Sequence, residues 1–318
     1  MQLQKSPPSL ETFSDRFQHI RFLSEEDSVP RTTARPPALG PTRARRFTAA
    51  FRPPRPTTAP GDPQAERFLA WILDRAGVNP THYRTAPLAR RLHACFRALR
   101  VRSVSEARQR LEREPERLAQ AANALLIGVT DFFRDPDVFR YLEETILPQL
   151  AAQGRGLRVW SAACADGAEL YSVAMLLADS GLLSSSTLLG TDCRADAIRQ
   201  AQRGWFEVGR LEGLNADLRQ RYFTAGGNGG RINAPLRHTV RWEQSDVLFA
   251  CDTREQPWDL ILCRNLAIYL ERAACTALWA RLAAALRSGG VLVVGKAERP
   301  EAPCGLVRQA PCVFEKRR

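Results

Sequence analysis

The sequence predicts an α/β fold in which a parallel sheet, covered by helices, follows a smaller all-helical region. Short apolar runs at residues 157–160, 187–190, 258–263 and 291–295 alternate with amphipathic segments of helical length. This alternation is the pattern of a parallel sheet with helices on both faces. Residues 61–127 show only the apolar spacing of helices. The chain therefore joins an all-helical region to an α/β domain.

The helical region has clear boundaries in the sequence. Asp62 followed by proline is the pattern of a helix start, and Gly77 is a stop signal. A second helix is expected around Leu88, and two more at 104–113 and 116–127. Opposite the apolar face of the second helix, the spacing predicts a basic stripe. Its members are Arg90, His93, Arg97 and Arg100.

The α/β domain is expected to cover residues 151–318, with residues 128–150 forming a linker and helix before it. Residues 221–242 interrupt the alternation of strands and helices, because five glycine-rich positions at 226–230 lie between two strand-like pieces. The sequence predicts a small β-hairpin insertion there.

The composition points to an anionic partner and a basic tail. The formal net charge is +12 over 318 residues, which suits nucleic acid, a membrane surface or an acidic protein. Residues 1–60 hold 10 of the 21 prolines and show no helical or strand period. We expect this segment to be a disordered tail, either a solvated linker or a segment that touches a membrane surface or nucleic acid.

Other classes of protein are excluded by the sequence. No apolar run approaches the roughly 18 residues that cross a bilayer. The start of the chain lacks the apolar core of a secretory signal, so a cytoplasmic location is expected. The eight cysteines form no CxxC pair and no Cys/His metal spacing, so we expect reduced thiols and no bound metal.

The first two strands of the sheet carry a cofactor signature. Small residues and Gly167 follow the first strand and allow a tight turn into the next helix, where Glu169 stands in the first turn. Asp192 ends the second strand, about 20 residues further on, where an acid accepts hydrogen bonds from ribose hydroxyls. These features predict an adenosine-containing cofactor, but they fit both NAD and S-adenosylmethionine.

Two further motifs resolve that choice. Residues 130–135 read Thr-Asp-Phe-Phe-Arg-Asp, and residues 263–269 read Cys-Arg-Asn-Leu-Ala-Ile-Tyr. Together with the Trp-Ser-Ala-Ala-Cys loop at 160–164 and the Thr-Asp pair at 191–192, they resemble the CheR-type chemotaxis receptor methyltransferases. The resemblance extends over about residues 65–318. It implies a Rossmann-like S-adenosylmethionine-dependent methyltransferase fold of about seven strands.

The resemblance also implies roles for individual residues. It places Arg134 and Tyr269 beside the methyl-transfer locus as catalytic residues. It implies that nine residues form the S-adenosylmethionine site: Thr130, Arg134, Gly167, Glu169, Asp192, Asp246, Val247, Arg264 and Asn265. The basic stripe of the helical region corresponds to the surface that meets the acidic helical bundle of the receptor.

The activity implied by the resemblance is methyl transfer to glutamate side chains of chemoreceptor-like signalling proteins. Such a carboxylate is already ionised at neutral pH, so no general base is required. The sequence departs from the family pattern at Ala168, Leu170, Asp246 and Lys296. These departures leave open a catalytically weak S-adenosylmethionine-binding regulator of a signalling array. A nucleic-acid methyltransferase is not expected, because no motif for a base-flipping pocket is present.

Overall fold

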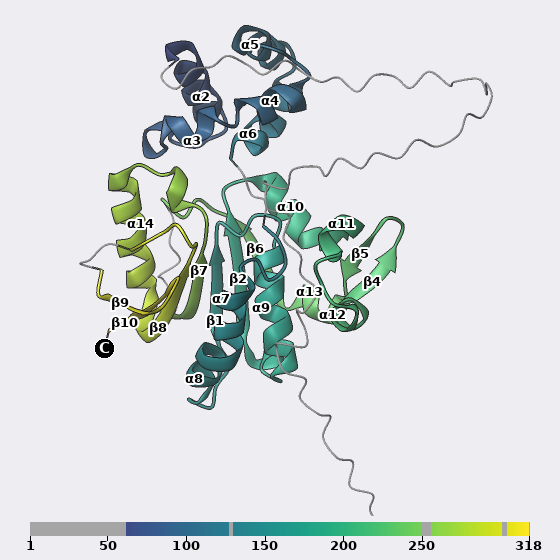
Figure 1. Ribbon diagram of the computed structural model, residues 1–318, viewed down its shortest axis with the longest axis vertical. Helices are drawn as coiled ribbons and strands as arrows, with labels where there is room; N and C mark the ends of the chain where they lie inside the picture. Colours follow the sequence, from purple (N-terminus) through teal and green to yellow (C-terminus); the bar gives the residue numbers. More distant parts are fainter. Residues whose placement is uncertain (1–61, 127–129, 250–255, 301–303, 318) are drawn as a thin grey trace, which may run out of the picture.

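The computed structural model describes residues 62–126, 130–249, 256–300 and 304–317 (Figure 1). The predicted basic tail at 1–60 lies outside the described residues. In the described part, a group of helices stands above an α/β domain whose strands are spread across the view in Figure 1.

The helical region consists of α2 to α6 and two short 3-10 helices. Asp62 caps the first helix through a hydrogen bond of 2.9 Å from the Gln64 backbone N–H to its Oδ1 atom, as the sequence predicts. Ile72, Leu92 and Leu125 are fully buried at the centre of this region. The elements are α2 (Pro63–Arg75), η1 (Pro80–His82), α3 (Thr85–Ala89), α4 (Leu92–Leu99), α5 (Val104–Arg113), η2 (Pro115–Arg117) and α6 (Leu118–Leu125).

The single helix predicted around Leu88 is wrong, because the chain breaks between α3 and α4. Arg90 ends α3 and Arg91 precedes α4, and neither end has a side-chain cap. Arg100 follows α4 in the left-handed region with φ of 56°. The apolar periodicity of residues 88–99 therefore comes from two short helices, each of which buries its own apolar face.

The main sheet has seven strands in the order β6-β2-β1-β7-β8-β10-β9. The first five are parallel, β10 pairs antiparallel with β8, and the edge strand β9 pairs antiparallel with β10. Trp160 of β1 is in register with Leu189 of β2 and with Ile261 of β7. The strands are β1 (Arg158–Ala162), β2 (Thr187–Asp192), β6 (Val240–Gln244), β7 (Trp258–Cys263), β8 (Leu286–Val294), β9 (Leu306–Ala310) and β10 (Val313–Lys316). This sheet confirms the predicted fold class.

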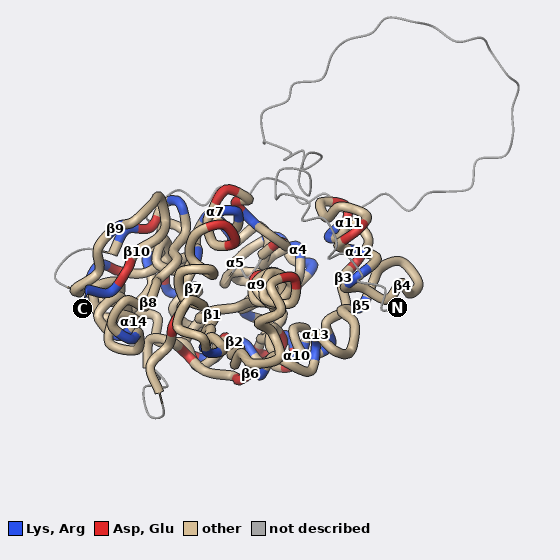
Figure 2. The backbone as a smooth tube through the Cα atoms, turned by 90° about the horizontal axis from the view of Figure 1, so that it is seen from below, with Lys and Arg blue, Asp and Glu red and all other residues tan. Residues whose placement is uncertain are grey.

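Helices cover both faces of the sheet, as a parallel sheet requires. Figure 2 shows α7 and α9 on one side of the strands and α14 on the other. From Ala168 to Leu177, every residue of α9 is buried, so the helix forms part of the core rather than its cover. The remaining helices are α7 (Pro136–Tyr141), η3 (Leu142–Ile146, a π-helix), α8 (Leu147–Ala151), α9 (Ala168–Asp179), η4 (Leu183–Ser185), α10 (Ala195–Arg203), η5 (Ala267–Tyr269) and α14 (Arg272–Ala285).

The insertion is larger than the hairpin predicted at 221–242. It is a three-stranded antiparallel sheet in the order β3-β5-β4, and its first strand, β3 (Trp205–Glu207), precedes the predicted segment. Strand β6, predicted as part of the hairpin, belongs to the main sheet instead. The three residues of β3 are too few to show a period of two. The other members are α11 (Val208–Leu211), α12 (Ala216–Tyr222), β4 (Phe223–Gly226), β5 (Gly229–Ile232) and α13 (Ala234–His238).

Two tyrosine-bearing segments hold the helical region against the sheet domain. The Arg84 N–H donates to the carbonyl of Tyr269, and the Glu271 N–H donates to the carbonyl of His82. Both donor–acceptor distances are 2.8 Å. Tyr83 and Leu270 form an isolated antiparallel bridge between these two bonds. The helical region is thereby fixed over the carboxyl ends of the central strands. In the part of the chain described here, no helix has both the length and the apolar character to cross a membrane.

Candidate functional site

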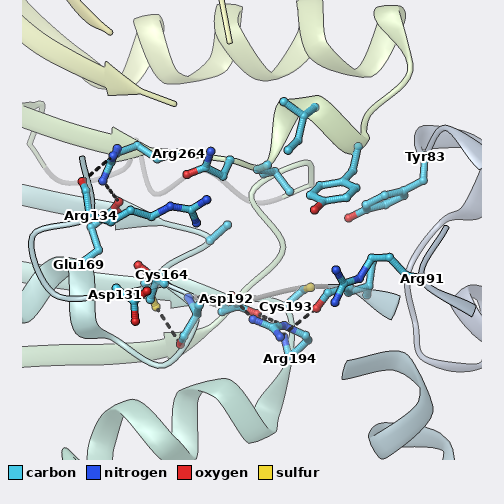
Figure 3. A pocket seen from close by; sticks show the side chains of 18 of the residues that line it. Tyr83, Arg91, Asp131, Arg134, Cys164, Glu169, Asp192, Cys193, Arg194 and Arg264 are labelled. Atoms are coloured by element: carbon cyan, nitrogen blue, oxygen red, sulfur yellow. Dashed lines mark hydrogen bonds and ion pairs between the residues drawn. The ribbon is translucent and has the colours of Figure 1, made fainter. Parts of the chain in front are cut away.

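A cavity of about 560 Å³ lies between the helical region and the carboxyl ends of β1, β2 and β7 (Figure 3). This is the edge at which ligands bind in open parallel sheets, and the volume is typical of a small-molecule site. Seven of the sequence-predicted site residues line it: Thr130, Arg134, Glu169, Asp192, Arg264, Asn265 and Tyr269.

The loop after β1 has an unusual backbone that explains its small residues. Ala163, Ala165 and Gly167 have φ of 59°, 53° and 87°, so alternate residues lie in the left-handed region. A Cβ atom on Gly167 would also lie 2.6 Å from the Trp242 ring. Each left-handed alanine costs roughly 1–2 kcal/mol. Such strain at a ligand-facing loop is a common mark of a functional site.

Glu169 and Arg264 form a buried ion pair on one wall of the cavity. The Glu169 Oε1 atom accepts from the Ser161 hydroxyl at 2.8 Å, and its Oε2 atom lies 3.2 Å from the Arg264 guanidinium. The same guanidinium donates to the Arg134 carbonyl at 2.8 Å and pairs with Asp135 at 2.6 Å. Arg264 therefore ties helix α9, strand β7 and the segment 130–135 together, and it faces the cavity from a site that is almost fully enclosed.

Asp192 at the tip of β2 is fully engaged by neighbours. Its Oδ1 atom accepts from the backbone N–H and the Nε–H of Arg194, at 3.0 and 2.9 Å. Its Oδ2 atom accepts from the Ala165 N–H at 3.0 Å and from the Arg194 Nη2 group at 3.1 Å. A carboxylate has about four acceptor positions. Arg194, which also donates to the Leu126 carbonyl at 3.1 Å, therefore occupies most of them and links Asp192 to the helical region.

Glu298 shapes the loop that follows β7. One of its oxygens accepts from the N–H groups of Asn265 and Gly295, at 2.8 and 2.6 Å, and the other accepts from that of Ala267 at 2.6 Å. This support holds Asn265 at a φ of 62°. Burial raises the pKa of Glu298, although the backbone donors oppose the shift. A buried carboxylate therefore positions Asn265 and the turn η5 that carries Tyr269.

Arg134 and Tyr269 face the cavity from different parts of the chain. Arg134 is half-buried, and its guanidinium points into the cavity in Figure 3. Tyr269 is half-buried at the end of η5, and its backbone is held by the bond from Arg84. The interdomain segment and the loop after β7 therefore bring a cation and a phenol to one enclosed space.

Three predicted cofactor residues lie outside the cavity lining. Gly167 supports the loop from behind by its contact with Trp242. Val247 is buried, and its carbonyl accepts from Arg281 at 3.0 Å. Asp246 has one oxygen bonded to the Leu248 N–H at 2.8 Å and one buried oxygen without a hydrogen-bond partner among the described residues. Burial raises the pKa of this carboxyl group.

The predicted basic stripe is not a continuous row on one helix. His93 and Arg97 lie in α4, whereas Arg90 and Arg100 occupy the flanking positions after α3 and α4. Arg90, Arg97 and Arg100 are exposed and His93 is half-buried. The cations are present at the surface, but the break at residues 90–91 removes the helical spacing on which the prediction depended.

Sequence reasoning missed several residues of the cavity, among them Tyr83, Arg91 and Arg194. Tyr83 and Arg91 reach it from the helical region, and Arg194 reaches it from the turn before α10. Burial raises the pKa of the Tyr83 hydroxyl. The sequence predicts one unbroken helix here, with Arg90 in the basic stripe. Arg91 falls outside that stripe, so the prediction gives it no role. Arg194 had one usable signal, its position two residues after the acid at the strand tip.

Within the described ranges, no group of three or more histidine, cysteine or acidic side chains is arranged to hold a metal ion. Burial raises the pKa of the cavity thiol Cys193 to about 12 and that of Cys164 well above its usual range. These thiols are therefore protonated at neutral pH and are poor nucleophiles.

Comparison with known proteins decides the family. Residues 128–306 match the model of the CheR methyltransferase, SAM binding domain. The chain belongs to the CheR methyltransferase family. The chain is 30% identical over 233 residues to a chemotaxis protein methyltransferase of Listeria innocua, covering 73% of this chain and 88% of that protein. It is 34% identical over 214 residues to chemotaxis protein methyltransferase 2 of Pseudomonas aeruginosa, covering 65% and 76%.

The chain is also similar to other methyltransferases. A probable biofilm formation methyltransferase, WspC, of Pseudomonas putida is 31% identical over 244 residues, which are 73% of this chain and 56% of that protein. Among solved structures, a TehB-like SAM-dependent methyltransferase of Corynebacterium glutamicum is 17% identical with a TM-score of 0.34, covering 65% of this chain and 97% of that one.

Membership of the CheR family confirms the resemblance seen in the sequence and identifies the chain as an S-adenosylmethionine-dependent methyltransferase. S-adenosylmethionine is the methyl donor. The described structure fits this cofactor: the cavity is of suitable size, the acid Asp192 stands at the strand tip, and the unpartnered oxygen of Asp246 provides a buried acceptor near it.

Proposed function

We propose that this protein transfers the methyl group of S-adenosylmethionine to glutamate side chains of chemoreceptor-like signalling proteins. The observation that carries the proposal is the convergence of Arg134 and Tyr269 on one cavity, beside the buried pair of Glu169 and Arg264. The family supplies the cofactor, and the Arg134 guanidinium at the cavity supplies a cation for an anionic acceptor.

The predicted cofactor residues divide into two groups by position. Asp192 and Asp246, at the ends of β2 and β6, would hold the ribose and the adenine amino group, with Val247 beside the ring. Thr130, Glu169, Arg264 and Asn265 would surround the amino-acid end of the cofactor. Glu169 carries the negative charge that suits an ammonium group, while Arg264 suits a carboxylate.

The remaining task is to orient the acceptor and exclude water. S-adenosylmethionine supplies a methyl group on a positively charged sulfur. Arg134 would bind one oxygen of the acceptor carboxylate through a charge-assisted hydrogen bond, and the Tyr269 hydroxyl would donate to it. Holding the acceptor oxygen about 3–3.5 Å from the methyl carbon removes much of the entropic barrier. No proton has to move, because the acceptor is already ionised.

The partner of this site is expected to be acidic. The net charge of +12 and the exposed Arg90, Arg97 and Arg100 favour an acidic helical region of the acceptor over a neutral one. Long-range attraction of this kind raises the association rate and weakens as the salt concentration increases. His93, half-buried in α4, would lie at the edge of the same contact.

An Arg134→Ala variant tests the proposed role of the cavity. The variant loses the cation that is proposed to bind the acceptor carboxylate, so we expect kcat to fall by about 100-fold or more. The affinity for S-adenosylhomocysteine, measured by calorimetry, should change by less than about threefold. A membrane fraction of the host cell supplies the methyl-accepting protein. Mass spectrometry then locates the added methyl groups.

The matched control is Arg140→Ala, which removes an exposed arginine that forms an ion pair with Asp137 and does not line the cavity. It should methylate at the wild-type rate. Methyl groups found on bases, lysines or lipids rather than on glutamate would contradict the proposal, as would an Arg134→Ala variant with normal kcat.

A further inference from the structure

A second cavity lies on the other side of the turn that carries Tyr269. It has a volume of about 510 Å³ and is distinct from the cofactor cavity, but Ile268 contributes to both walls. Its floor is apolar, with Leu270 and Trp279 both buried. The turn η5 is therefore a thin partition between two spaces, one of which holds the reacting groups.

The rim of the second cavity is strongly cationic. Arg84 comes from the helical region, Arg272 from the start of α14, and Arg299 from the segment after β8. All three side chains are exposed. Glu271 is the one exposed acid among the described residues that line the cavity, since the carboxylate of Glu298 is buried and faces backbone N–H groups. The rim therefore carries an excess of positive charge over an apolar floor.

This combination favours an acidic protein segment over nucleic acid as the occupant. Single-stranded nucleic acid binds through exposed aromatic rings on which bases stack. Trp279, the aromatic residue in this lining, is only 2% exposed and offers no such face. A peptide with acidic side chains and one small apolar side chain meets both the rim and the floor, because its carboxylates pair with guanidinium groups.

The second cavity is also connected to the reaction site. Glu298 forms part of its lining and at the same time accepts the hydrogen bond from Asn265, which lines the cofactor cavity. The backbone of Arg84 donates to the Tyr269 carbonyl. A segment bound between Arg84 and Arg299 would therefore rest against the elements that position Asn265 and Tyr269.

We propose that the second cavity is a docking groove for an acidic segment of the methyl-accepting protein, close in sequence to the glutamate that is methylated. This inference rests on the proposed function and adds where the acceptor is held. The groove would align the acceptor beside Tyr269 and would contribute to binding of the protein acceptor but not of the cofactor.

A double charge reversal, Arg84→Glu with Arg299→Glu, tests the docking groove. Initial rates of methyl transfer are measured against increasing amounts of host membrane fraction. We expect the KM for the membrane fraction to rise tenfold or more, because two attractive charges become repulsive. The kcat at saturation and the dissociation constant of S-adenosylhomocysteine should stay within about twofold of the wild type, since neither residue touches the cofactor cavity.

The matched control is Arg203→Glu with Arg219→Glu, which makes the same change in net charge at exposed positions in α10 and α12. These helices lie on the opposite side of the molecule from α14 (Figure 1). The control should keep the wild-type KM. If both double variants raise the KM equally, the effect is one of net charge and the docking groove is wrong.

The outcomes separate the two proposals. If the wild type transfers no methyl group to glutamate, the proposed function fails. If the wild type is active and the Arg84/Arg299 variant has a normal KM, only the docking groove fails. Should the charge reversal prevent folding, Arg84→Gln with Arg299→Gln serves instead. Binding of a labelled glutamate–alanine peptide provides a direct readout. We expect the peptide to bind the wild type but not this milder variant. Equal binding to both proteins would contradict the docking groove.

Discussion

At the scale of single residues, the contacts of Asp192 carry a consequence for cofactor binding. A ribose hydroxyl that donates to Asp192 must share or displace an existing donor, because Arg194 and Ala165 already supply four hydrogen bonds. Arg194 also places a positive charge beside the site of a positively charged cofactor. Arg194 therefore stabilises the unliganded protein and opposes the ligand.

An Arg194→Met variant should separate these two effects. Methionine fills the space of the arginine but donates no hydrogen bond, so the buried Asp192 carboxylate is left partly unpaired. The free energy of unfolding of the ligand-free protein should therefore fall by about 3 kcal/mol. The affinity for S-adenosylmethionine, measured by calorimetry, should increase several-fold, because the bare carboxylate is free to accept. Arg199→Met, at an exposed position in α10, the helix that follows Arg194, should change neither quantity. Weaker cofactor binding in Arg194→Met would show that Arg194 helps to position Asp192 instead.

At the scale of elements, the turn η5 depends on one carboxylate. In Glu298→Gln, an amide NH₂ replaces an oxygen, so at least one of the N–H groups of Asn265, Ala267 and Gly295 loses its acceptor. A buried donor without an acceptor costs about 1–3 kcal/mol. Thermal unfolding should show this loss, and cofactor affinity should fall with it. The control Glu207→Gln, at an exposed position, should change neither the unfolding temperature nor the cofactor affinity. If Glu298→Gln also changed neither, the loop would be held by other contacts.

Glu298 also predicts a dependence of stability on pH. Burial raises the pKa of its carboxyl group in the folded protein above the value in the unfolded chain. The folded state therefore binds the proton more tightly, and the contribution of this group to stability falls as the pH rises from the unfolded to the folded pKa. Denaturant unfolding at several pH values should show that slope in the wild type. The slope should be reduced in Glu298→Gln, and an unchanged slope would contradict the assignment.

The sequence predicted some elements and missed others for physical reasons. Strands β1, β2, β7 and β8 each contain a short apolar run, so their positions follow from the sequence pattern. The break at Arg90 and Arg91 could not be seen, because both short helices bury leucines at the spacing of one longer helix. The strand β3 was missed because it is paired by β5, a partner distant in the chain.

At the scale of the whole molecule, the cofactor cavity is assembled from segments on both sides of the domain boundary. Arg194 donates to the Leu126 carbonyl, and the backbone N–H groups of Arg84 and Glu271 donate across the boundary to the carbonyls of Tyr269 and His82. The motifs in the sequence located the sheet side of this cavity. They gave no sign of Tyr83 or Arg91, because the contribution of the helical region depends on how it packs on the sheet.

Ligand binding should therefore tighten the contact between the two parts of the chain. With S-adenosylhomocysteine bound, the amides of Arg84 and Glu271 should exchange with deuterium more slowly, along with those of residues 163–167. Hydrogen exchange followed by mass spectrometry measures both sets in one experiment. The edge strand β9 is the internal control and should not change. Protection limited to residues 163–167 would show that the helical region does not respond to the ligand.

The central claim is that this CheR-family protein methylates carboxylates. The most direct measurement is incubation with tritiated S-adenosylmethionine and a host membrane fraction, followed by treatment with base and collection of volatile methanol. Carboxyl methyl esters release methanol in base, whereas methyl groups on nitrogen do not. The account predicts base-labile tritium that depends on the enzyme and is absent from Arg134→Ala. Bound cofactor with no base-labile label in any host protein would contradict it and would favour a regulatory, non-catalytic role.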